Sequence, residues 1–197
     1  MTMKINTLVV CSALTLLGGV LPAEEVSKDF VPVNLGLFDP CQIADRSEDV
    51  CGFQLGVLWD RCQDMYGISI AGGGNVIHGR SVGVMAALGF NSVGPDSLGV
   101  VWAFGFNRCG GDFGGWSSAY GANICHGHFR GFQEAVSNYA NSMHGVQFGF
   151  VNTAHDCHGL QVGLLNMTED MSGFQVGVLN FIKNSPLPFF PIVNAHF

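Results

Sequence analysis

The feature that most constrains this chain is a short unit that recurs at a fixed spacing. The clearest copies are residues 144–152, 158–166 and 172–180, which read HGVQFGFVN, HGLQVGLLN and SGFQVGVLN and begin 14 residues apart. Residues 51–58 form an earlier copy and residues 131–138 a looser one. Self-similarity at so short a period indicates a fold built by stacking one structural unit many times.

Asparagines carry this period through the middle of the chain, where the rest of the unit is weaker. They stand 16 residues apart at first, then 15, then 14: Asn75, Asn91, Asn107, Asn123, Asn138, Asn152, Asn166, Asn180 and Asn194. Each unit alternates as a strand does, with Phe174, Val176 and Val178 on one face and small or polar residues on the other. We therefore expect an all-β fold of about eleven strands and no helix in residues 30–197.

The N-terminus has the pattern of a targeting segment. Lys4 precedes an apolar stretch at residues 7–21, and Ala23 precedes two acidic residues. This predicts a signal peptide at residues 1–23, a short segment at 24–29 and a single β-repeat domain at 30–197. The protein is then exported, to the outer membrane or the cell surface. A net charge of -7 and the lack of a basic stripe argue against nucleic acid as a partner.

An exported chain meets an oxidising compartment, so its cysteines can form disulfides. The candidates are Cys41, Cys51, Cys109 and Cys125, and the spacing leaves their connectivity open. Cys109 and Cys125 each lie two residues after a repeat asparagine. They would stack within disulfide range in a parallel coil and lie at opposite ends in an antiparallel meander.

Two architectures suit a repeat of one strand: an antiparallel meander closed as a small outer-membrane-type β-barrel, or a short-rung parallel β-solenoid. If residues 97–107 form one strand of about ten residues, the short connector cannot return to its start unless the strand bends at Gly99 or Gly105. The outward apolar face and the terminal Phe197 also suit a barrel in lipid. We therefore expect the barrel, with outer-membrane lipid as its partner and the solenoid as the alternative.

The G-x-Q-x-G-x-x-N units, the segment 32–38 (PVNLGLF) and the segment 188–194 (PFFPIVN) resemble the bacterial surface-repeat-containing proteins first noted in spirochaetes. The resemblance runs from about Val31 to the end, is clearest over residues 143–180 and is weaker over residues 66–141, where most of the glutamines are lost. It implies export and placement at the surface or outer membrane. It implies no activity, ligand or catalytic residue.

Few residues are candidates for chemistry. Histidine and cysteine are metal ligands, and two turns supply His126, His128, His155, His158 and Cys157 as a candidate metal site. A nucleophilic Cys157 beside His155 or His158 lacks an orienting third group, so we expect no enzyme and no cofactor. The repeated glutamines are expected to form a hydrogen-bonded ladder between strands.

Three functional hypotheses follow. The first is a non-catalytic, structural or weakly conducting outer-membrane barrel. The second is a surface β-solenoid that acts as a binding or adhesion scaffold. The third is an envelope protein that binds metal through its Cys/His turns. The ligand and the oligomeric state are left open by the sequence.

Overall fold

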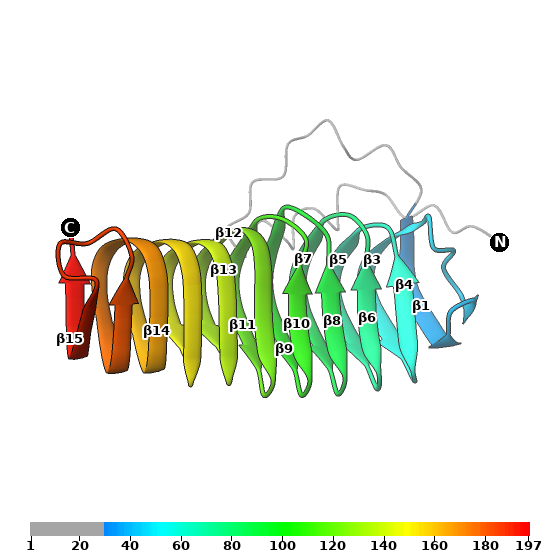
Figure 1. Ribbon diagram of the computed structural model, residues 1–197. Helices are drawn as coiled ribbons and strands as arrows, with labels where there is room; N and C mark the ends of the chain where they lie inside the picture. Colours follow the sequence, from blue (N-terminus) through cyan, green and yellow to red (C-terminus); the bar gives the residue numbers. More distant parts are fainter. Residues whose placement is uncertain (1–29) are drawn as a thin grey trace.

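The structure is a computed structural model that describes residues 30–197, over which the chain winds as an elongated parallel β-solenoid (Figure 1). The predicted all-β repeat fold is confirmed, and residues 30–197 contain no helix. The predicted antiparallel meander is wrong, because successive coils pair in parallel. The closed barrel is wrong with it, and the solenoid alternative holds. The predicted signal peptide at 1–23 and segment at 24–29 lie outside the described residues.

One 15-stranded sheet, folded on itself, contains all the strands. They are β1 (Phe30–Phe38), β2 (Cys41–Gln42), β3 (Asp49–Gly56), β4 (Trp59–Cys62), β5 (Met65–Ala71), β6 (Gly74–Ile77), β7 (Ser81–Ala87), β8 (Phe90–Val93), β9 (Ser97–Ala103), β10 (Phe106–Cys109), β11 (Phe113–Ala119), β12 (Ala122–Glu134), β13 (Ser137–Phe148), β14 (Val151–Ile182) and β15 (Phe189–His196). A typical coil has a long strand, a tight turn, a short strand and a second turn. Long strands pair with long strands and short with short, which gives the solenoid two faces.

The barrel prediction failed because the segment 97–107 is not one strand. It turns at Phe104 and Gly105, so that β9 and β10 are the long and short strands of one coil. The Gly105 N–H donates to the Gly89 carbonyl of the coil before it, at 2.8 Å. The second turn then needs to span only the distance from the short strand back to the next long strand. The chain therefore returns to the same register after 16 residues, and 15 strands replace the expected eleven.

A column of glycines shapes the coils, with two in β14 and one in each of β3, β5, β7, β9, β11, β12 and β13. Their φ angles lie between +124° and +147°: Gly52, Gly67, Gly83, Gly99, Gly115, Gly131, Gly145, Gly159 and Gly173. A Cβ on Gly115 would overlap the carbonyl oxygen of Gly99 in the preceding coil. Only glycine fits there. The inward and outward alternation of the strand continues through it, so that Leu98 and Val100 lie outside while Val101 is buried.

The interior between the two faces is narrow and partly polar. Apolar side chains such as Met65, Phe113, Phe129, Met143 and Ile182 fill one part of it. The repeat asparagines fill another, where each amide donates to the next asparagine at 2.7–3.0 Å, from Asn75 through Asn180. The expected glutamine ladder is confirmed along Gln133, Gln147, Gln161 and Gln175, at 2.7–2.9 Å. These ladders hold identical positions of successive coils in register.

Antiparallel strands cover both ends of the stack. At one end β2 pairs antiparallel with β1, and at the other β15 runs back antiparallel along the last coil of β14. The helix-free range 30–197 accordingly offers no helix that could cross a membrane.

Candidate functional site

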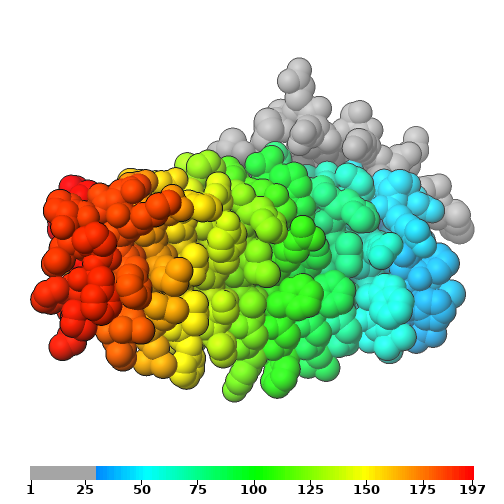
Figure 2. All heavy atoms as spheres, viewed as in Figure 1, coloured from blue at the N-terminus to red at the C-terminus, as the bar shows by residue number. Residues whose placement is uncertain are grey.

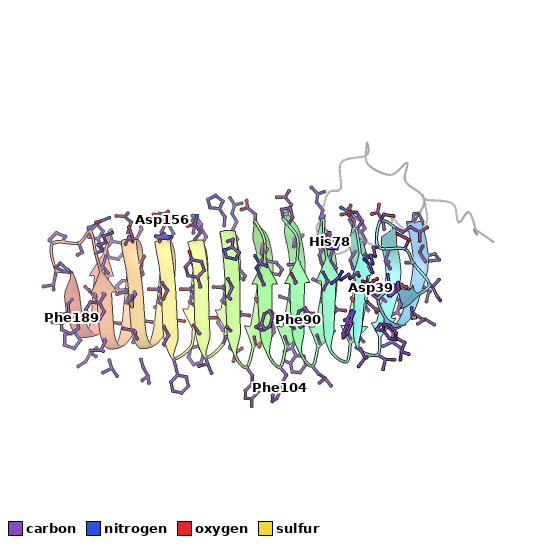
Figure 3. All side chains as sticks on the ribbon, turned by 45° about the vertical axis from the view of Figure 1, so that its right-hand side comes forward. Asp39, His78, Phe90, Phe104, Asp156 and Phe189 are labelled. Atoms are coloured by element: carbon purple, nitrogen blue, oxygen red, sulfur yellow. The ribbon has the colours of Figure 1, made fainter. Side chains whose placement is uncertain are left out.

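The two turns of a coil form two edges of opposite character that run along the solenoid. We call the row of turns from short to long strands the polar edge; it holds residues 63–64, 78–80, 94–96, 110–112, 126–128, 141–142, 155–156, 169–170 and 183–184. We call the other row the apolar edge; it holds residues 57–58, 72–73, 88–89, 104–105, 120–121, 135–136, 149–150, 163–164 and 177–178. Figure 3 shows His78 and Asp156 toward one edge and Phe104 at the opposite one.

The predicted metal ligands fall into two groups in different coils: His126 and His128 share one turn of the polar edge, and His155 lies in another, with Cys157 and His158 just after it. The rings of His126 and His155 are separated by Tyr139, whose ring centroid is 6.4 Å from the first and 6.5 Å from the second. His128 pairs in register with Ser142. The ring of His158 instead stacks on His144 at 4.6 Å. Burial, followed by the nearby His158 and Arg130, lowers the pKa of His144.

Cys157 points away from these histidines, into the core. Its side chain is buried, and burial raises the pKa of the thiol to about 12. A thiol in this state is a poor nucleophile and a poor metal ligand, since both roles need the thiolate. Among residues 30–197, no three His, Cys, Asp or Glu side chains gather closely enough to hold a metal ion. The structure therefore does not bring the five predicted residues together.

The cysteines Cys109 and Cys125 are in-register neighbours on β10 and β12, as expected for a parallel coil. Both are buried thiols. The hydrogen bond between them lowers the pKa of Cys109 and raises that of Cys125, because the Cys109 thiolate accepts from the Cys125 S–H. The other two candidates have different neighbours, with Cys41 paired to Phe38 and Cys51 to Tyr66.

Mild oxidation of the folded protein is expected to join Cys109 to Cys125. In-register Cα atoms on neighbouring strands are about 4.8 Å apart, within the range that a disulfide spans. Closing a loop of this length is expected to raise the free energy of unfolding by about 3 kcal/mol. Non-reducing peptide mapping and chemical denaturation check both points, with Cys109→Ser as the control. A crosslink from either cysteine to Cys62 or Cys157 would contradict the register.

Asp60 is a buried carboxyl group at the start of the asparagine ladder. Its Cα partner in the next coil is Asn75, so it takes the place that asparagine holds elsewhere. Neither carboxyl oxygen finds a hydrogen-bond partner within residues 30–197, although the side chain is fully buried. Burial raises the pKa of Asp60 to about 6. The protonated form fits this position better than the carboxylate, because the next ladder member presents an amide oxygen.

Asp60→Asn is expected to stabilise the protein at pH 7 and to leave its stability at pH 3 nearly unchanged. Below its unfolded pKa near 3.8, Asp60 is protonated in both states, and the penalty builds up as pH rises to about 6. The gain at pH 7 should be about 2 to 3 kcal/mol, measured by chemical denaturation from about pH 3 to pH 8. The exposed Asp96→Asn is the matched control and should change little. An equal gain at every pH would contradict a role for ionisation.

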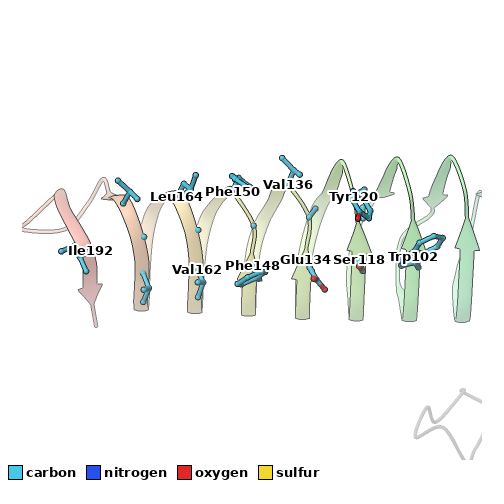
Figure 4. Close-up of a pocket in the computed structure, with 17 residues that line it drawn as sticks. Trp102, Ser118, Tyr120, Glu134, Val136, Phe148, Phe150, Val162, Leu164 and Ile192 are labelled. Atoms are coloured by element: carbon cyan, nitrogen blue, oxygen red, sulfur yellow. The ribbon is translucent and has the colours of Figure 1, made fainter.

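A shallow groove of about 830 Å³ runs beside the apolar edge and crosses six coils (Figure 4). One side is formed by the last outward positions of the long strands: Trp102, Ser118, Glu134, Phe148, Val162 and Val176. The other side is formed by the apolar edge: Tyr120, Val136, Phe150, Leu164 and Val178. Ile192 of β15 lies at one end of the groove. The sequence did not reveal this groove, because its two sides become visible only once the turn positions are known.

Comparison with family models, with curated proteins and with solved structures finds no match for this chain. The fold therefore defines only a broad class of protein: this is an all-β repeat protein built as a parallel solenoid.

Proposed function

We propose that this protein is a non-catalytic scaffold of the bacterial envelope surface, whose long regular faces bind a partner. The observation that carries the proposal is how the polar side chains are used. Asn123 bonds to Asn107, to Asn138 and to two backbone carbonyls within the core. The glutamines bond to one another in the same way. These amides maintain the stack, which leaves the outer surface to do the binding.

The outer surface of the long strands supports a binding role. Large apolar side chains project from it in columns along the whole stack; examples are Leu35, Ile68, Val84, Trp116 and Phe174. Contiguous exposed apolar surface of this extent marks an interaction site in most proteins. Solenoids commonly use such extended surfaces to bind partners. The resemblance of the repeats to bacterial surface-repeat proteins points in the same direction.

Labelling of Cys41 tests the placement at the surface. This side chain is exposed, whereas Cys62 is buried. Because Cys51 is only half-buried, the test uses a Cys51→Ser background. A membrane-impermeant maleimide, applied to intact cells after a membrane-impermeant reductant, is expected to modify this protein and not the variant that also carries Cys41→Ser. Cys62 should react only after denaturation. Modification of Cys41 only after the cells are lysed would place the protein inside the envelope and reject the proposal.

A further inference from the structure

We infer that the apolar edge inserts into the hydrocarbon boundary of a lipid layer, so that the solenoid lies with its long axis along the membrane surface. The inference rests on the proposed function only in placing the protein at the envelope. The inference adds that the apolar edge of the scaffold contacts lipid. The mode of binding is interfacial, as for proteins that lie on a membrane without spanning it.

The first support is the chemistry of the nine turns of the apolar edge. They contain only Gly, Ala and larger apolar residues, with Tyr120 the sole side chain that has a polar atom. Seven successive turns each project one large side chain, and we call these the apolar row: Leu88, Phe104, Tyr120, Val136, Phe150, Leu164 and Val178. They are between 49% and 69% exposed. Turns facing water normally carry polar residues, so the composition of this edge calls for a non-aqueous contact.

The second support is the separation of charge across the coil. Charged side chains occupy the opposite, polar edge: Asp64, Arg80, Asp96, Asp112, Asp156, Glu169, Asp170 and Lys183. With the apolar row in lipid, this edge faces water; Figure 3 shows Asp156 on the side opposite Phe104. Glu134 is the charged residue that lines the groove beside the row. Because a carboxylate is costly to place in hydrocarbon, it limits insertion to about the depth of the turns.

The third support is the shape of the edge. Seven turns at the spacing of paired strands make a row about 30 Å long, and two stacked sheets make it about 10 Å wide. A second copy could therefore cover only about 300 Å² here, compared with the roughly 800 Å² per partner of a stable interface. Figure 2 shows the straight, elongated body to which these coils belong. Fluid hydrocarbon needs no complementary partner, and acyl chains can fill the groove alongside the row.

Aromatic rings stand at the level expected of a membrane interface. Trp102 and Tyr120 line the groove, and the Tyr120 ring stacks on Phe104 at 4.9 Å. Tryptophan and tyrosine prefer the headgroup level of a bilayer, where the ring body is apolar and one atom remains hydrogen-bonded to water. The position of Trp102 just inside the apolar row matches this arrangement.

Flotation with neutral phosphatidylcholine vesicles tests the inference on the purified exported protein. The wild type is expected to float, and Phe104→Ser, Phe150→Ser and Leu164→Ser together should lower the bound fraction at least about tenfold. The matched control replaces Ile68, Val84 and Phe174 with serine on the broad face. These are similarly exposed and lie away from the row, so this triple variant should float normally. Circular dichroism and thermal melting verify that both variants fold.

Tryptophan quenching gives a second readout. The chain has three tryptophans, so Trp59→Phe with Trp116→Phe leaves only Trp102 as the fluorophore. Lipids brominated along the acyl chain should quench Trp102 strongly. They should quench Trp116 weakly when Trp102 and Trp59 are replaced, because Trp116 lies mid-strand.

Three outcomes would overturn the inference: a wild type that stays in the aqueous fraction, equal quenching of Trp102 and Trp116, or equal loss of flotation in both triple variants. A dimer that the broad-face variant dissociates would then assign the apolar surface to a second copy instead. The Cys41 labelling does not depend on the apolar row. Its failure would remove the envelope placement and leave the vesicle result intact.

Discussion

Gly115→Ala is expected to lower the free energy of unfolding by roughly 4 kcal/mol, enough to unfold many domains of this size. Two causes add. The φ of Gly115 is +124°, where a side chain is strained, and the new Cβ would overlap the Gly99 carbonyl of the preceding coil. Relief would require β9 and β11 to move apart, which would break their backbone hydrogen bonds. Chemical denaturation followed by circular dichroism measures the loss.

The control for this change is Gly110→Ala on the polar edge. A Cβ there meets nothing closer than the Val93 carbonyl oxygen at 3.6 Å. Its cost should stay within about 0.5 kcal/mol. If the two variants unfold at the same denaturant concentration, the glycine column does not constrain the stack in the way its geometry indicates.

Asn123→Ala is expected to lower the free energy of unfolding by about 3 to 5 kcal/mol, because it removes a donor and an acceptor from the middle of the asparagine ladder. The Asn123 amide donates to the Ser117 and Glu134 carbonyls at 3.0 and 2.9 Å, and to Asn138 at 3.0 Å. Its oxygen accepts from Asn107 at 3.0 Å. Alanine would leave these buried groups unsatisfied, and the narrow core has little room for water to replace the amide.

Asn141→Ala is the matched control, since this asparagine is exposed on the polar edge of the next coil. Its free energy of unfolding should lie within about 0.5 kcal/mol of the wild-type value. If both variants lose equally little free energy of unfolding, the asparagine ladder sets the register of the coils without adding to their stability. Unfolding free energies from equilibrium denaturation distinguish the two results.

The repeat, the all-β class and the glutamine ladder could be predicted from the sequence because each depends on local spacing. The direction of the strands could not. Gly99 and Gly105 are both glycines in an apolar segment, yet one has a positive φ within β9 and the other forms a turn. Their roles depend on the neighbouring coil, whose carbonyl oxygens approach both positions. A strand length estimated across Gly105 therefore led to the barrel.

The candidate site was predictable only in part, for a similar reason. The pairing of Cys109 with Cys125 followed from spacing once a parallel coil was assumed. The separation of His126 from His155 by one coil did not, because the two turns look alike in sequence. Asp60 lies 15 residues before Asn75, but its different residue type concealed its place in the ladder. The apolar edge required the turn positions, which periodicity alone does not give.

The coil lengths have a consequence for how such a protein can change over generations. Coils of 16 residues and coils of 14 residues share the same glycine column and the same asparagine ladder. Each end of the stack has its own antiparallel cover. Duplication or loss of one unit in the gene therefore lengthens or shortens the molecule by about 4.8 Å without altering any other coil. The length of the molecule is therefore set by the number of repeat units in its gene, and selection can change that length one unit at a time.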